Sequence, residues 1–249
     1  MFNSISLIFC HLLKYFCKKI DIMEVVYEDN HIIVVNKAPG EIVQGDKTGD
    51  TPLVESVRAY IKEKYAKPGN VFCGLVHRLD RPVAGLVVFA RTSKALSRMN
   101  ELFRNGGVRK TYWAITRNAP RQPQERLTHW ITSVERNNKS YASLRPVAGA
   151  KEASLSYRHI ASSDRYHLLE INLETGRKHQ IRVQLSSIGC PVRGDLKYGD
   201  KRSNPDGSIS LMARHIEFVH PVSGEPLSLT APLPAADKLW QVLESQINN

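Results

Sequence analysis

Strand-like stretches of apolar residues recur along the chain, and the first begins near residue 24. Residues 25–27 and 31–36 are β-branched and apolar, and polar residues separate them. Two such stretches joined by a polar turn predict a strand pair. Apolar side chains at helical spacing follow over residues 53–61, after Thr51 as a capping hydroxyl and Pro52 in the first turn, which predicts a helix.

The middle of the chain mixes both kinds of element. Residues 71–76 and 86–90 are apolar and predict two strands, with a polar, turn-like stretch over residues 77–85 between them. Residues 93–104 carry apolar side chains at helical spacing and end at two glycines, which predicts a helix. A strand is expected over residues 110–116.

The second half of the chain begins with a long polar segment. Residues 117–153 are polar and rich in Arg, Asn and Pro, which predicts irregular hairpins. Residues 166–173 alternate as a strand does, and residues 177–188 place apolar side chains on one helical face before a glycine. A strand is expected over residues 215–219 and a closing helix over residues 235–247.

These elements together define the expected fold class. The closing helix is expected to direct Leu239, Val242 and Leu243 inward. Strands dominate, and helices occur between them without regular βαβ alternation. This pattern favours an α+β fold with a mixed, largely antiparallel sheet and flanking helices over a doubly wound one. We expect residues 23–249 to form a single domain.

Charge and cysteine usage narrow the possible partners and the compartment. Lys and Arg number 35 against 24 acidic residues, a net charge of +11, which attracts polyanions such as nucleic acid. A dispersed solvated surface would give the same charge, so motifs must decide. None of the four cysteines has C-x-x-C spacing, which argues against a zinc site or a disulfide framework and favours the cytoplasm.

Residues 1–22 contain an apolar run that needs a separate interpretation. The run over residues 5–16 includes His11 and Lys14 and is shorter than the roughly 20 residues of a membrane-spanning helix. No small-residue cleavage site frames it as a secretory signal. We therefore expect no membrane association, and we interpret residues 1–22 as a disordered leader or an over-long start.

The sharpest chemical feature is the charged loop His77-Arg78-Leu79-Asp80-Arg81 between two apolar strands. A loop held between rigid strands presents its side chains to a cleft, as catalysis requires. The plainer alternative is a turn in which Asp80 pairs with Arg78 or Arg81, and the residues alone give both readings about equal weight.

A second feature is the run from Gly176 to Arg182, where a glycine turn opens the expected helix. Free N–H groups at a helix start, with Arg177, Lys178 and Arg182 nearby, would make an anion site. The alternative is a solvated surface run. Gln180 and Arg182 flank the inward-facing Ile181, however, so both are expected to point inward, and a buried Arg182 needs a carboxylate such as Asp80.

A third feature is the basic, aromatic strand start Arg109-Lys110-Thr111-Tyr112-Trp113. One ring would stack on a base while Lys110 meets a phosphate. The alternative, that Tyr112 and Trp113 simply cover the two faces of a strand, is the more common arrangement.

Together these residues resemble the RluA family of pseudouridine synthases, whose central motif is HRLD followed by a glycine turn and an apolar strand. The resemblance runs from about Glu24 to the end of the chain. Besides the HRLD loop it includes the following stretches: Tyr27-Glu28-Asp29, Val34-Val35-Asn36-Lys37, Lys110-Thr111-Tyr112, Gly176-Arg177-Lys178-His179-Gln180-Ile181-Arg182, Gly194-Asp195 and Tyr198-Gly199.

The resemblance implies a function and a set of site residues. The function is isomerisation of a uridine in structured RNA, tRNA or rRNA, by a fold with a central cleft, without metal or cofactor. Asp80 would be the catalytic carboxylate, with Tyr112 packed against the target base and Arg182 paired with Asp80, while Arg78 helps to extrude the base. Further RNA-binding candidates are His77, Lys110, Arg177, Lys178, His179 and Gln180. No S4 domain is expected, and a monomer is our default.

The chain departs from the common family pattern at several positions. Val83-Ala84 stands where Thr-Ser is common, and Lys178 stands where a small hydroxyl residue is common. Gln184 and Cys190 replace frequent histidines. These positions bear on substrate choice more than on activity. Two alternatives remain. One is a non-catalytic RNA-binding or ribosome assembly protein; the other, a nuclease or DNA-binding protein, ranks last because the sequence has neither paired metal-binding carboxylates nor a recognisable helix-turn-helix.

Overall fold

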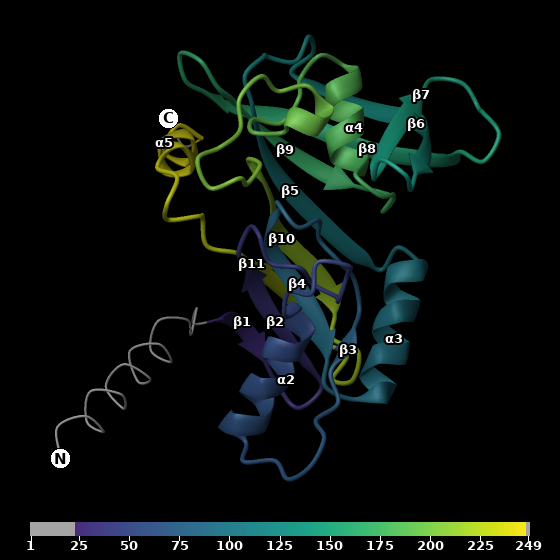
Figure 1. Cartoon of the computed structure of the whole chain (residues 1–249), viewed down its shortest axis with the longest axis vertical. Helices are drawn as coiled ribbons and strands as arrows, with labels where there is room; N and C mark the ends of the chain where they lie inside the picture. The colour runs from purple at the N-terminus through teal and green to yellow at the C-terminus, as the bar shows by residue number, and fades with distance from the viewer. Residues whose placement is uncertain (1–22, 248–249) are drawn as a thin grey trace, which may run out of the picture.

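The computed structural model describes residues 23–247, so the expected leader over residues 1–22 lies outside the described part of the chain. One large mixed sheet runs through the molecule and joins two halves, stacked one above the other in Figure 1. The strand order is β1-β2-β4-β10-β5-β9-β8-β6-β7, with β3 on β4 and β11 on β10. None of the helices within residues 23–247 is long and apolar enough to cross a membrane.

The N-terminal half combines four strands with two helices (Figure 1, purple to blue). Its elements are β1 (Glu24–Glu28), β2 (Ile32–Lys37), α2 (Leu53–Lys64), β3 (Gly74–Leu75), β4 (Ala84–Ala90) and α3 (Ser93–Arg104). The expected strand pair and both expected helices are confirmed. Helix α3 begins where predicted because the Thr92 hydroxyl accepts the Ala95 N–H and caps it.

The C-terminal half is built on five strands and carries the helix that borders the site. Its elements are β5 (Val108–Thr116), β6 (Gln124–Val134), β7 (Lys139–Ser143), β8 (Lys151–Ser162), β9 (His167–Leu173), α4 (Gln180–Ser187) and the short 3-10 helix η1 (Leu196–Tyr198). The chain then returns to the first half through β10 (Leu211–Val219) and β11 (Pro226–Thr230) and ends in α5 (Leu239–Ser245).

Strand β10 joins the two halves by pairing with β5 on one side and β4 on the other. The β5 pairing is antiparallel, whereas the β4 pairing is the parallel one in an otherwise antiparallel sheet. It needs a glycine at position 85, because φ there is +112° and a Cβ atom would lie 2.3 Å from the Ala213 carbonyl oxygen. The backbones of β4 and β10 therefore lie in close contact at Gly85, just after the 77–83 loop in the chain.

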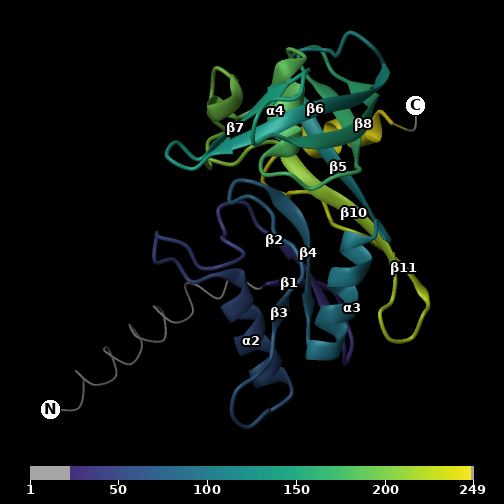
Figure 2. The same ribbon diagram turned by 90° about the vertical axis from the view of Figure 1, so that its right-hand side faces the viewer.

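Apolar clusters cover both faces of the sheet. On one face α2 and α4 pack through Val57, Ile61 and Ile181, and on the other α3 and α5 pack through Met99 and Trp240. Figure 2, turned by 90°, shows α2 and α3 on opposite sides of the N-terminal strands. Tyr112 and Trp113 are neighbours on β5, so their side chains point to opposite faces of the sheet and belong to different clusters. Tyr112, a predicted site residue, lies on the face that α2 and α4 cover.

The expectation of irregular hairpins over residues 117–153 is correct in the hairpin and wrong in its irregularity. Strands β6 and β7 form a regular antiparallel hairpin, and β6 with 11 residues and β8 with 12 are the two longest strands of the described sheet. Strand β6 buries Leu127, His129 and Ile131 on one face and exposes polar side chains on the other. An antiparallel strand with one solvated face reads as polar, which explains the error.

Three smaller expectations are also corrected. Strand β3 covers Gly74–Leu75 rather than residues 71–76. Helix α4 begins at Gln180 rather than residue 177, because Gln180 accepts the Arg177 N–H through its side chain and closes a turn there. Val242 is 48% exposed, so it does not face the core as Leu243 does.

Candidate active site

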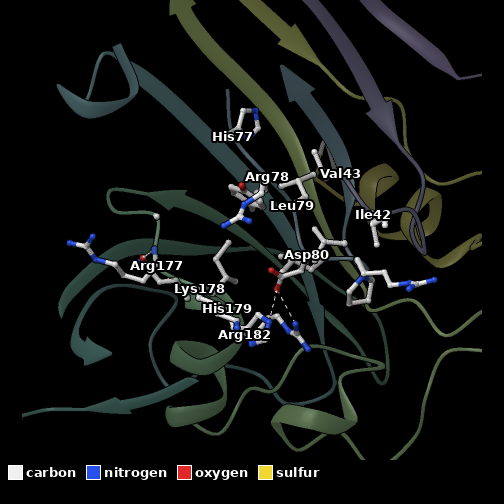
Figure 3. Close-up of a pocket in the computed structure, with 18 of the residues that line it drawn as sticks. Ile42, Val43, His77, Arg78, Leu79, Asp80, Arg177, Lys178, His179 and Arg182 are labelled. Carbon is white, nitrogen blue, oxygen red and sulfur yellow. Dashed lines mark hydrogen bonds and ion pairs between the residues drawn. The ribbon is translucent and has the colours of Figure 1, made fainter. Parts of the chain in front are cut away.

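A cavity of about 860 Å³ opens where the 77–83 loop meets the turn that precedes α4 (Figure 3). All ten residues singled out in the sequence line it: His77, Arg78, Asp80, Lys110, Tyr112, Arg177, Lys178, His179, Gln180 and Arg182. They come from the loop, from β5, and from the turn and first residues of α4. Asp80 in the loop and Arg182 in α4 are 102 positions apart in the chain. The fold therefore brings the three sequence features together at one place.

Asp80 presents its carboxylate to this cavity from a loop that the backbone holds firmly. The Asp80 carbonyl accepts the Val83 N–H, and the Arg81 carbonyl accepts bonds from the Gly40 N–H and from Lys37 Nζ. Lys37 is 1% exposed, and burial lowers its pKa to about 8. The loop thus has little freedom to move Asp80 away from its partners.

One carboxylate oxygen of Asp80 faces two nitrogen atoms. Arg182 Nη1 lies 2.9 Å from Oδ2 and His179 Nε2 lies 3.5 Å from the same oxygen; both contacts are dashed in Figure 3. Among the described residues, every side-chain contact of Asp80 goes to Oδ2. The side chain is 29% exposed and lines the cavity, and Oδ1 is not among the buried atoms that lack a partner, so this oxygen is accessible.

Arg182 is buried and is held by a second carboxylate as well. Its Nε and Nη2 donate to the two oxygens of Asp195 at 2.6 Å and 2.9 Å, a two-pronged pairing. Burial opposes the charge of Arg182, but the hydrogen bonds and charges of Asp195 and Asp80 prevail and raise its pKa. The guanidinium therefore stays cationic and holds Asp80 and Asp195 at once.

The alternative pairing of Asp80 with its neighbouring arginines does not occur. Arg81 pairs with Asp50 at 2.5 Å, and exposed Arg78 donates to Gln44 at 3.4 Å. Arg78 therefore lies at the cavity rim with its guanidinium toward solvent. The pairing expected between Asp80 and Arg182 is confirmed.

Tyr112, Lys110 and His77 form one wall of the cavity. Tyr112 is 7% exposed, and burial together with the charge of Asp80 raises its pKa. Burial lowers the pKa of Lys110, whose ammonium lies 5.6 Å from the centre of the Phe103 ring. His77 stacks on Phe103 and accepts the Val88 N–H, so that nitrogen is committed to the protein.

The turn before α4 supplies the opposite wall. Arg177 and Lys178 are exposed, and Arg177 Nε donates to the Glu152 carbonyl. The Gln180 amide is bonded within the protein: its oxygen accepts from Thr175 and Arg177, and its nitrogen donates to Ser154. The geometry thus gives Gln180 a structural part, while Arg177 and Lys178 keep donors available.

Sequence reasoning gave no role to Asp195 or Tyr198, although both lie in its quoted motifs. Asp195 is 1% exposed, and the Tyr198 ring lies 4.9 Å from the Arg182 guanidinium carbon. The sequence did contain a signal for a second carboxylate such as Asp195. A guanidinium has five N–H donors, and a single partly exposed carboxylate cannot satisfy all the donors of a buried guanidinium. Nothing in the sequence spacing pointed to Tyr198.

Comparisons with known proteins agree with this fold and site. Residues 31–187 match the family model described as RNA pseudouridylate synthase. Ribosomal large subunit pseudouridine synthase D of Zymomonas mobilis is 32% identical over 85% of this chain and 69% of that protein. The tRNA pseudouridine synthase C of Pectobacterium carotovorum is 29% identical over 90% of this chain and 62% of that protein. The structure of human RNA pseudouridylate synthase domain containing 4 has a TM-score of 0.72 at 26% identity, covering 90% and 92% of the two chains.

Fold, site and matches define an RNA pseudouridine synthase, an isomerase that converts uridine to pseudouridine in RNA. Within that class the chain belongs to the RluA family, as its HRLD motif and its curated relatives indicate. The alternative of a non-catalytic RNA-binding protein is not retained.

Proposed function

We propose that Asp80 is the catalytic carboxylate, acting on the ribose of a uridine that leaves its helix or loop to enter the cavity. The observation that carries this proposal is the asymmetry of the carboxylate: Oδ2 is held by Arg182 at 2.9 Å, while the contacts of Oδ1 are left to the cavity. A negative charge steadied by a guanidinium and open on one side is suited to nucleophilic or base chemistry.

The reaction breaks the bond from C1′ to N1, turns the uracil and joins C1′ to C5. The proton that leaves C5 goes to solvent, and N1 gains one, so substrate and product are isomers. Asp80 either attacks C1′ or removes a proton from C2′, and both routes need an ionised carboxylate. The detached uracil must stay in the cavity between the two steps, which the buried wall around Tyr112 supports.

The residues around Asp80 have roles in extruding the target uridine from its stack. A base inside a stack cannot reach the carboxylate, and extruding it costs a few kcal/mol, least in loops and bulges. Arg78, exposed at the rim, takes the place of the extruded base. Tyr112 packs against the uracil, and Lys110, Arg177 and Lys178 meet the phosphates that flank it.

The substrate is a loop of tRNA or rRNA, bound by the catalytic domain itself. The printed names of the relatives include both RNA classes, so the choice between them stays open in this proposal. The net charge of +11 suits either. Action as a monomer in the cytoplasm, without metal or cofactor, stays a sequence-based prediction.

The role of Asp80 is tested by tritium release from RNA that contains uridine labelled at C5. Asp80→Asn should abolish release while circular dichroism shows a folded protein. The matched control is Asp50→Asn, because Asp50 is an exposed carboxylate that pairs with the neighbouring Arg81. Release by Asp80→Asn at the rate of this control would refute the assignment.

The RNA target is found by mapping pseudouridine in tRNA and rRNA from cells with and without the gene. A single position that loses its modification identifies the substrate, and return of the modification with wild type but not with Asp80→Asn links it to the proposed carboxylate. Loss at stacked duplex positions would argue against a loop target.

A further inference from the structure

A chain of polar contacts runs from strand β7 to Asp80 through Tyr198 and His179. The Ser140 N–H donates to the Tyr198 hydroxyl at 2.7 Å, and that hydroxyl lies 2.8 Å from His179 Nδ1. On the other edge of the ring, His179 Nε2 lies 3.5 Å from Asp80 Oδ2. Ser140, Tyr198 and His179 are 0%, 4% and 8% exposed, so water has little access to this chain.

One bond in this chain has a fixed direction: the backbone amide of Ser140 can only donate, so the Tyr198 oxygen accepts from it. Among the described contacts of the Tyr198 hydroxyl, His179 Nδ1 is the acceptor that remains for its proton, and the Asp80 carboxylate on the other edge of the ring favours a hydrogen on Nε2. Nδ1 then accepts, which leaves the proton of a neutral imidazole on Nε2, the atom that faces Asp80. Tyr198 thereby selects one of the two tautomers.

Burial favours the neutral form of the imidazole. Burial lowers the pKa of His179 to about 4; the charges of Arg182, Lys197 and Lys178 act in the same direction, and that of Asp80 opposes them. Selection of a tautomer is therefore meaningful, because a protonated ring would carry hydrogen on both nitrogens and would not depend on Tyr198.

The backbone holds His179 in an uncommon conformation that serves the same contact. His179 precedes α4 with φ of +55°, a left-handed geometry that few side chains adopt. The Ser140 hydroxyl donates to the Lys178 carbonyl at 2.8 Å and clamps the peptide just before it. One buried residue of β7 thus anchors both Tyr198 and the strained turn, and such strain is common at functional sites.

We propose that Tyr198 is a positioning residue for the isomerisation: its hydroxyl fixes the Nε2–H form of His179, so that His179 and Arg182 together hold Asp80 Oδ2 and keep Oδ1 toward the ribose. This proposal rests on the proposed catalytic role of Asp80. The 3.5 Å contact is about 0.5 Å longer than a hydrogen bond, and we expect it to shorten by that amount when substrate is bound.

The first test is Tyr198→Phe, which removes the hydroxyl and keeps the ring beside Arg182. The matched control is Tyr157→Phe, which removes a buried hydroxyl that bonds to Gln122 and Glu125. At saturating enzyme, Tyr198→Phe should slow pseudouridine formation about ten-fold or more, as loss of tautomer control does elsewhere. The Kd for RNA should stay unchanged, and the control should match wild type in both.

The second test is a double-substitution cycle with His179→Gln. The glutamine amide reaches the position of Nε2 and donates to Asp80 with no help from Tyr198. We therefore expect Tyr198→Phe to cause no further loss of rate in the His179→Gln background. Rate losses that simply multiply would overturn the proposal, because they would mean that the two residues act separately.

The third test reads the tautomer itself in the substrate-free protein. Histidine labelled with ¹⁵N, with the His179 signals assigned by their absence in His179→Gln, should show hydrogen on Nε2 and an accepting Nδ1. Hydrogen on Nδ1 would overturn the proposal even if Tyr198→Phe failed to fold. Asp80→Asn is assayed alongside. Activity in that variant would refute both the proposed role of Asp80 and the positioning role of Tyr198. An inactive Asp80→Asn together with a fully active Tyr198→Phe would refute only the positioning role.

Discussion

Replacing Arg182 should reduce stability and activity through two different carboxylates. In Arg182→Met, Asp195 is left at 1% exposure without either of its side-chain hydrogen bonds. Removing one partner of a buried ion pair costs about 3–5 kcal/mol, a large share of the roughly 5–15 kcal/mol that holds a domain folded. With a urea slope of about 2–3 kcal/mol per molar, the unfolding midpoint should fall by about 1–2.5 M.

A second substitution separates the stabilising part of Arg182 from its catalytic part. Asp195→Leu in the Arg182→Met background removes the buried carboxyl group that has lost its partner, so the urea midpoint should recover most of its loss. Tritium release should not recover, because Asp80 still lacks its guanidinium. A midpoint for Arg182→Met equal to that of wild type, or a double variant no more stable than Arg182→Met, would refute this reasoning.

Three further outcomes follow from the site and its scaffold. Burial lowers the pKa of His77 to about 3, so below pH 6.5 the unfolded chain binds a proton at this residue that the folded chain does not bind. The free energy of unfolding should therefore fall between pH 6.5 and 3, by up to about 1.4 kcal/mol per pH unit. Urea titrations of His77→Gln should show a smaller dependence of stability on pH. Gly85→Ala should unfold at far lower urea than Gly40→Ala, since both glycines have positive φ but only at position 85 would a Cβ atom strike a backbone. RNA affinity should fall steeply as salt rises from about 50 to 200 mM, and a Kd independent of salt would contradict binding through phosphates.

Much of the fold could be predicted because local and tertiary preferences agree. Helix α3 matches its predicted bounds, since a capping threonine, an apolar face and a glycine stop all point to the same ends. Strand pair β1 and β2 was equally clear. Strand β6 and the start of β8 were missed because polar side chains occupy their solvated positions, so their apolar content is low.

The residues that line the cavity could be predicted from the sequence, whereas the contacts among them could not. The motif resemblance pointed to Asp80, Tyr112 and Arg182, and burial of Arg182 could be argued from its place beside Ile181. The second carboxylate, Asp195, and the hydroxyl of Tyr198 reach the site through a 3-10 turn whose orientation depends on packing against β7 and α4. No sequence periodicity encodes that orientation.

The catalytic role of Asp80 is tested by a single-turnover assay at saturating protein with the mapped RNA, comparing wild type with Asp80→Asn. We expect equal RNA affinity, because the carboxylate contributes chemistry rather than phosphate binding, and no detectable pseudouridine from the variant. Pseudouridine formed by Asp80→Asn at the wild-type rate would contradict that role.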